Sequence, residues 1–275
     1  MPTGVSPVLP RLVGIKAVLF DVYGTLLVSG SGDISLARAE DRGPAIALAL
    51  KRAGYAVPKP EAPFGKLLLE TIEAFRASLK EKGTLYPEVR IEAVWKEFIS
   101  IATSREWVGA AGQLESAIID YECRVNPCWP MPGATAVLQA LREHGLCLGI
   151  ISNAQFYTPL LMEALLGRPP SGLGFDPELC IWSYELLEGK PSHRLYSIAA
   201  QHLANQGIQP SAVLFVGNDM RNDIWPAQVT GFKTALFAGD KRSLRWREDH
   251  PQAGQTSPDA IVTTLSDLSG LIGLS

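Results

Sequence analysis

The stretch IKAVLFDVYGTLL, residues 15–27, decides the fold class of this chain. Its first six residues are nearly all apolar and do not alternate with polar ones, as expected for a strand buried on both faces of a parallel sheet. Similar runs occur at residues 146–152, 212–217, 179–183, 233–237 and 259–263. Helical patterns accompany them at residues 133–144, 192–206 and 223–229. Strands that alternate with helices predict an α/β fold with a doubly wound, Rossmann-like parallel sheet.

Residues 33–129 interrupt this rhythm and predict an inserted helical domain. Helical patterns lie near residues 44–53, 64–82, 91–103 and 113–125, and we predict no strand between them. Three prolines, at positions 127, 130 and 132, close the segment. We therefore expect a core of residues 1–32 and 130–275 and an all-helical domain of residues 33–129. Trp95, Phe98 and Trp107 are expected to pack inside that domain.

Composition and charge limit the partners that we expect for this protein. The net charge is −3 and no basic run stands out, which argues against a nucleic-acid partner. The apolar stretches are shorter than the roughly 18 residues that span a bilayer. Residues 1–11 are rich in proline, lack a signal-peptide pattern and are expected to form a loose tail. The four cysteines have no metal-binding spacing and fit a reducing cytoplasm. The oligomeric state stays open.

Four polar clusters follow strands of the predicted sheet or lie in loops close to them. They are residues 21–26, 152–153, 189–191 and 217–223. Each has an ordinary structural explanation by itself, such as a helix cap or a solvated turn. Ligands of doubly wound sheets bind outside the carboxyl ends of the strands, however, and all four clusters are placed there. The sequence therefore predicts one active site made from these four segments.

Together the four clusters resemble the motifs of the haloacid dehalogenase-like hydrolase superfamily, over roughly residues 13–30 and 130–270. The resemblance implies that Asp21 is the nucleophile, which splits one displacement into two easier steps. It implies that Thr25 holds the loop, and that Ser152 and Asn153 bind the transferring group. Lys190 would supply a positive charge near the nucleophile and the substrate anion. Residues 33–129 would be the helical cap of this superfamily.

The acidic fourth cluster of the resemblance implies a Mg²⁺ cofactor. The implied metal site consists of Asp21, Tyr23, Asp219 and Asp223, because Mg²⁺ prefers oxygen ligands. Asp219 is expected to bind directly, and Asp223 is expected to support the site from behind. Asp219 or Asp223 could instead cap the helix that begins nearby.

Tyr23 departs from the pattern of the superfamily's phosphatases. Most of them carry a second aspartate at this place, which acts as general acid and base. Tyrosine here is similar to the 2-haloacid dehalogenases, whose halide leaves without a proton. A halide-binding arginine could then be Arg38, Arg42 or Arg52. Three functions follow from these motifs. The acidic fourth cluster favours a phosphatase of a small phosphorylated metabolite, with an aspartyl-phosphate on Asp21. The alternatives are a 2-haloacid dehalogenase and a non-catalytic relative that binds a phosphate ligand.

Overall fold

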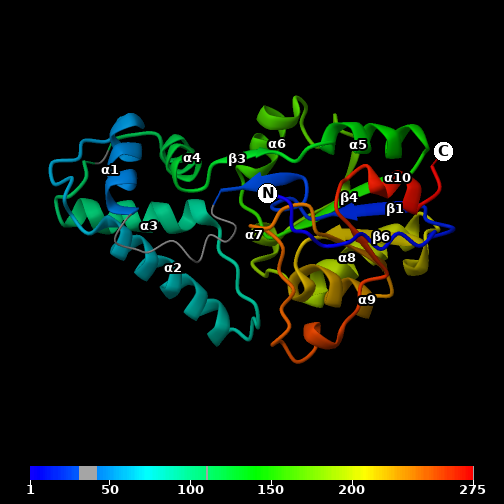
Figure 1. Ribbon diagram of the computed structural model, residues 1–275. Helices are drawn as coiled ribbons and strands as arrows, with labels where there is room; N and C mark the ends of the chain where they lie inside the picture. The colour runs from blue at the N-terminus through cyan, green and yellow to red at the C-terminus, as the bar shows by residue number, and fades with distance from the viewer. Residues whose placement is uncertain (31–41, 110, 275) are drawn as a thin grey trace.

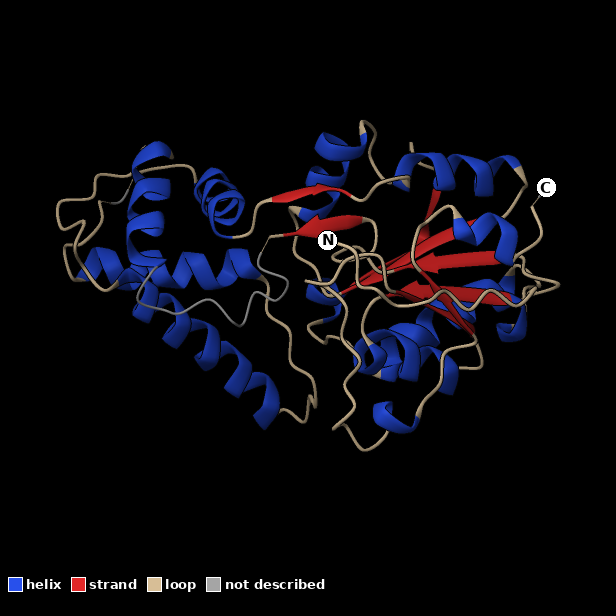
Figure 2. Ribbon diagram, in the orientation of Figure 1, coloured by secondary structure: helices blue, strands red, loops and turns tan. Residues whose placement is uncertain are grey.

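The computed structural model describes residues 1–30, 42–109 and 111–274. Within them one parallel sheet has the strand order β5-β4-β1-β6-β7-β8. The strands are β1 (Ala17–Phe20), β4 (Cys147–Ser152), β5 (Phe175–Trp182), β6 (Val213–Gly217), β7 (Lys233–Phe237) and β8 (Ala260–Val262). Helices lie on both sides of this sheet (Figures 1 and 2). The predicted α/β fold with a doubly wound parallel sheet is confirmed.

The surroundings of strand β1 explain why its sequence is apolar throughout. Val18 and Phe20 belong to the core under α5 (Ala134–Glu143), α6 (Thr158–Leu166) and α10 (Asp267–Leu271). Ala17 and Leu19 belong to the core under α8 (His193–Asn205) and α9 (Trp225–Val229). Figure 1 shows these two groups of helices on opposite faces of the sheet. Because both faces are covered, all four side chains of β1 are fully buried.

The strand order places β1 at the topological switch point of the sheet. From β1 the chain continues on one side to β4 and β5, then crosses over to β6, β7 and β8 on the other side. The carboxyl ends of β1, β4 and β6 therefore adjoin one crevice, which is where doubly wound folds bind their ligands. The short helix α7 (Ser183–Leu186) follows β5, and the turn η4 (Met220–Ile224) follows β6.

Four helices form a second hydrophobic core beside the sheet (Figure 1). They are α1 (Gly43–Arg52), α2 (Phe64–Glu81), α3 (Ile91–Ser104) and α4 (Leu114–Val125). Each boundary lies within one residue of its prediction. Trp95 and Phe98 are fully buried in this core and Trp107 packs against it, as expected. The predicted start of the insert, Asp33, and the halide-arginine candidate Arg38 lie outside the described residues.

Two predictions about local structure were wrong. The strand β3 (Cys128–Pro130) begins inside the segment expected to lack strands, and it pairs antiparallel with β2 (Leu27–Ser29). Its three residues carry no pattern of their own, since pairing with a distant segment creates the strand. The N-terminal stretch is also not loose, because Val8 and Ile261 exchange two backbone hydrogen bonds of 2.9 Å. Among the described residues, no helix combines the length and apolarity needed to cross a membrane.

Candidate active site

A pocket of about 350 Å³ lies between the carboxyl ends of the strands and the four-helix part. Its sheet side includes Asp21, Lys190, Asp219 and Asp223. The predicted motif residues therefore converge, although up to 202 positions separate them in the chain (21 to 223). Its helical side comes from α2, α3 and α4, and includes Trp95.

Asp21 directly follows β1, and its carboxylate lies against two donors. Its Oδ1 atom accepts a hydrogen bond of 3.0 Å from Ser152 Oγ and one of 2.6 Å from Lys190 Nζ. Ser152 ends the neighbouring strand β4, so the parallel register brings the two side chains together. Ser152 is fully buried and does not line the pocket. In this structure its hydroxyl orients Asp21, and contact with the transferring group stays a prediction.

Lys190 bridges two carboxylates below the pocket. Its Nζ atom lies 2.6 Å from Asp21 Oδ1 and 2.5 Å from Asp223 Oδ1, and all three side chains are buried. Burial opposes the charge on Lys190, but Asp21 and Asp223 outweigh it and raise the pKa of the ammonium. Asn153 holds the main chain here, since its Oδ1 accepts a 2.7 Å hydrogen bond from Lys190 N. The side chain of Asn153 thus positions Lys190.

Asp223 uses both of its oxygens within the protein. Oδ1 pairs with Lys190, and Oδ2 accepts hydrogen bonds from the backbone N–H groups of Asn218 and Asp219, at 3.0 and 2.9 Å. Burial raises the pKa of Asp223 to about 7, although the charge of Lys190 lowers it. Asp223 therefore braces the loop after β6, and its support of a metal site stays a prediction.

Both carboxylate oxygens of Asp219 also accept hydrogen bonds within the protein. Its Oδ1 accepts hydrogen bonds from the backbone N–H groups of Arg221 and Asn222, so it caps the turn η4 as a helix N-cap would. The guanidinium of Arg247 donates to both carboxylate oxygens, with the shortest distance 2.7 Å to Oδ2. Sequence reasoning missed Arg247. The available signal was the basic segment 241–247, which follows the carboxyl end of β7.

The loop after Asp21 is tied to the loop after β6. Thr25 Oγ1 donates a 3.2 Å hydrogen bond to Asn218 Oδ1, and Thr25 is fully buried. Gly24 has φ +89°, and an added Cβ would lie 2.7 Å from Asn218 Nδ2 and from Ser243 Cβ. Thr25 therefore ties the two motifs together, and the absence of a side chain at Gly24 allows their close approach. Neither residue lines the pocket.

Tyr23 lines the pocket as a neutral phenol. Its hydroxyl forms a 2.9 Å hydrogen bond with Thr158 Oγ1. Burial raises the pKa of Tyr23 well above its usual value, and the charges of Glu122 and Asp21 raise it further. A phenol in this state is a poor proton donor and a poor base near neutral pH.

Oxygen atoms that suit Mg²⁺ lie at the pocket. Both side-chain contacts of Asp21 fall on Oδ1, and the main-chain carbonyl of Tyr23 accepts no hydrogen bond from the described residues. Mg²⁺ is commonly held by one or two carboxylates plus substrate phosphate and water. The described residues contain no cluster of three or more His, Cys, Asp or Glu side chains placed to hold a metal.

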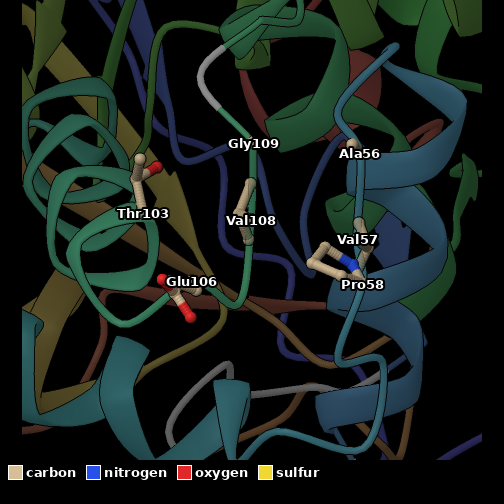
Figure 3. A pocket seen from close by; sticks show the side chains of 7 residues that line it. All are labelled: Ala56, Val57, Pro58, Thr103, Glu106, Val108 and Gly109. Carbon is tan, nitrogen blue, oxygen red and sulfur yellow. The ribbon is translucent and has the colours of Figure 1, made fainter.

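A second hollow, of about 460 Å³, lies on the four-helix part between residues 56–58 and 103–109 (Figure 3). Val57 and Pro58 line one side of it, and Val108 lines the other. Among the described residues that line it, Glu106 is the one with a charged side chain. It contains none of the four predicted motifs, so the pocket beside Asp21 is the candidate active site.

Comparison with known proteins identifies the family of this chain. The haloacid dehalogenase-like hydrolase family matches residues 15–231. The chain is 28% identical over 142 residues to ribulose-1,5-bisphosphate 5-phosphatase of Halopiger xanaduensis, covering 52% of this chain and 56% of that protein. It is 25% identical over 246 residues to N-acetylmuramic acid 6-phosphate phosphatase of Pseudomonas aeruginosa, covering 86% and 85%.

A 2-haloacid dehalogenase structure from Pseudomonas syringae shares the fold, with a TM-score of 0.57 and 21% identity. That match covers 94% of this chain and 97% of the dehalogenase. The chain belongs to the haloacid dehalogenase-like hydrolase family, and the predicted resemblance is confirmed. Both phosphatases and dehalogenases are among its relatives.

Proposed function

We propose that this protein is a Mg²⁺-dependent phosphatase of a small phosphorylated metabolite, and that Asp21 carries the phosphoryl group. The observation that supports this most is the buried arrangement of Asp21, Lys190 and Asp223 at the floor of a small-molecule pocket. Two relatives named as phosphatases, at 28% and 25% identity, favour phosphate esters over haloacids. Residues 33–129 would form the cap domain and residues 1–32 with 130–275 the core.

In this proposal the Asp21 carboxylate attacks phosphorus, and the bond from phosphorus to the ester oxygen breaks. Ser152 and Lys190 orient the carboxylate through the two contacts on Oδ1. The departing alcohol takes its proton from solvent, since the buried phenol of Tyr23 is a poor donor. Water then adds to the phosphorus, which releases Asp21 and inorganic phosphate.

Bound Mg²⁺ would neutralise charge on the phosphoryl oxygens. Asp21 and the main-chain carbonyl of Tyr23 would hold it, and Asp219 would contribute once Arg247 withdraws. Asp223 would stay a support, because its two oxygens already pair with Lys190 and the backbone. A cytoplasmic location fits a soluble enzyme of this kind.

A 2-haloacid dehalogenase is the second candidate, and two observations favour it. Tyr23 stands where these enzymes carry tyrosine, and Arg42, one of the arginines considered for halide binding, lines the same pocket as Asp21. Arg52 does not qualify, since it is exposed and pairs with Asp120. In this case the Asp21 carboxylate would displace halide from carbon and form an ester.

One experiment separates the two candidates. Wild type and Asp21→Asn are assayed on phosphate esters and 2-haloacids, with Mg²⁺ and with chelator, for phosphate and halide release. We expect phosphate release that needs Mg²⁺ and is lost in Asp21→Asn, while circular dichroism shows that the variant is folded at the assay temperature. Metal-independent halide release would establish the dehalogenase instead. Turnover by Asp21→Asn within a few fold of wild type would refute the nucleophile.

A further inference from the structure

The helical side of the active-site pocket contains buried polar atoms that lack a well-placed partner. Trp95 Nε1 and Tyr121 Oη meet no partner at good hydrogen-bond geometry among the described residues, although the guanidinium of Arg42 acts on the Tyr121 phenol; the two residues are 0% and 6% exposed. Both side chains line the pocket, and their rings pack together with centroids 5.4 Å apart. An unpaired buried donor is costly, so such atoms call for a partner. A ligand in the pocket can supply that partner.

Glu122 adds an acceptor beside these two donors. It follows Tyr121 on α4, lines the pocket and is 7% exposed. Asn126 Nδ2 donates a 3.2 Å hydrogen bond to its Oε1, and Tyr157 also bonds to the carboxylate. The wall of the pocket therefore offers both donors and an acceptor within one short stretch of α3 and α4.

The charges at this wall favour an uncharged ligand group. The positive charge of Arg42 acts on both Tyr121 and Glu122, so the single negative charge of Glu122 is offset locally. A hydroxyl group can accept from Trp95 or Tyr121 and donate to Glu122 at the same time.

The wall and the nucleophile belong to one pocket. Tyr23 lies between them, since the charges of both Asp21 and Glu122 act on its phenol. A volume of about 350 Å³ suits a small metabolite. With its phosphoryl group at Asp21, an ester would extend its alcohol part towards Trp95.

We propose that Trp95, Tyr121 and Glu122 form a subsite that binds hydroxyl groups of the ester's alcohol part, so that the substrate is a sugar or polyol phosphate. This inference rests on the proposed phosphatase function. The aromatic face of Trp95 and the aliphatic side chains of Leu68 and Ile118 complete the subsite with surfaces for C–H groups.

The test compares esters that differ in hydroxyl groups alone. Ribose 5-phosphate and glucose 6-phosphate are paired with pentyl and hexyl phosphate, which also leave as primary alkoxides. Wild type should prefer the sugar phosphates by tenfold or more in kcat/KM. Trp95→Phe and Tyr121→Phe should each lower the preference for sugar phosphates, measured as the ratio of kcat/KM for the sugar phosphates to that for the alkyl esters, by about threefold to tenfold, the effect of one lost hydrogen bond.

Matched controls come from the same helical part. Trp107→Phe and Tyr55→Phe alter residues that do not line the pocket, so they should keep the preference of wild type. Equal efficiency of wild type on sugar and alkyl esters would overturn the subsite, as would variants that slow both probes equally.

Failure of the phosphatase function would look different. In that case no phosphate would be released from any probe, 4-nitrophenyl phosphate included. Calorimetry then decides on the subsite. Ribose 5-phosphate should bind to wild type more tightly than pentyl phosphate, and Trp95→Phe should reduce that difference. Equal affinities of the two probes would overturn the subsite.

Discussion

Replacing Lys190 with methionine should strongly destabilise the folded protein. The change keeps the length of the side chain but removes the charge between Asp21 and Asp223, at 2.6 and 2.5 Å. The three side chains are 3%, 8% and 1% exposed, so water cannot replace the lost ammonium. Removing one partner of a buried ion pair costs about 3–5 kcal/mol. At about 2–4 °C per kcal/mol, the melting temperature should fall by roughly 6–20 °C.

The assay is thermal unfolding, with a double variant to identify the cause. Lys190→Met/Asp223→Asn removes one of the stranded carboxylates, while the asparagine oxygen can still accept from the backbone after β6. It should recover much of the lost stability. The deficit of Lys190→Met should also shrink at low pH, since protonation removes the carboxylate charges.

Lys233→Met is the matched control for this substitution. Its Nζ atom lies 3.3 Å from Asp259 Oδ1, but the two side chains are 45% and 25% exposed. Such a pair contributes about 0–1 kcal/mol. If Lys190→Met melts within two degrees of this control, or if the double variant is no more stable than the single one, the reasoning is refuted.

Three further predictions concern the pocket. Gly24→Ala should lower the free energy of unfolding, measured in urea, by about 1–3 kcal/mol, because φ is +89° and the new Cβ would lie 2.7 Å from Asn218 Nδ2. An unchanged urea midpoint would contradict this. Burial raises the pKa of Glu122. The folded protein therefore holds the carboxyl proton of Glu122 at pH values above the unfolded pKa of about 4.3. The free energy of unfolding falls as the pH rises from that value to the folded pKa. Glu122→Gln should accordingly gain melting temperature over wild type at about pH 8 but not at about pH 4, and an equal gain at both would oppose the assignment. Tyr23→Asp should raise hydrolysis of esters with poor leaving groups relative to good ones, provided it stays folded; an unchanged leaving-group dependence would show that this position does not accommodate a general acid.

Local patterns in the sequence determined the fold and the chain segments of the site. Strands such as β1 are short apolar runs, and helices such as α3 have an apolar period, so each is visible within a few residues. Asp21, Lys190 and Asp223 could be selected because each lies just after a strand or in a loop close to one, where a parallel sheet collects its ligands. The inserted helical part was visible for the same reason, since it lacks apolar runs of strand type.

Only the tertiary structure decided which atoms meet. Pairing with a remote segment creates the strand β3, and the approach of the loop after β7 to the loop after β6 places Arg247 on Asp219. Sequence also predicted Trp95 as a packing residue, which it is, but did not indicate that it borders the pocket. Its ring is buried in the helical core, while its side chain lines the pocket that contains Asp21. Such contacts depend on the relative placement of elements far apart in the chain, and that placement follows from the burial of whole faces rather than from any local pattern.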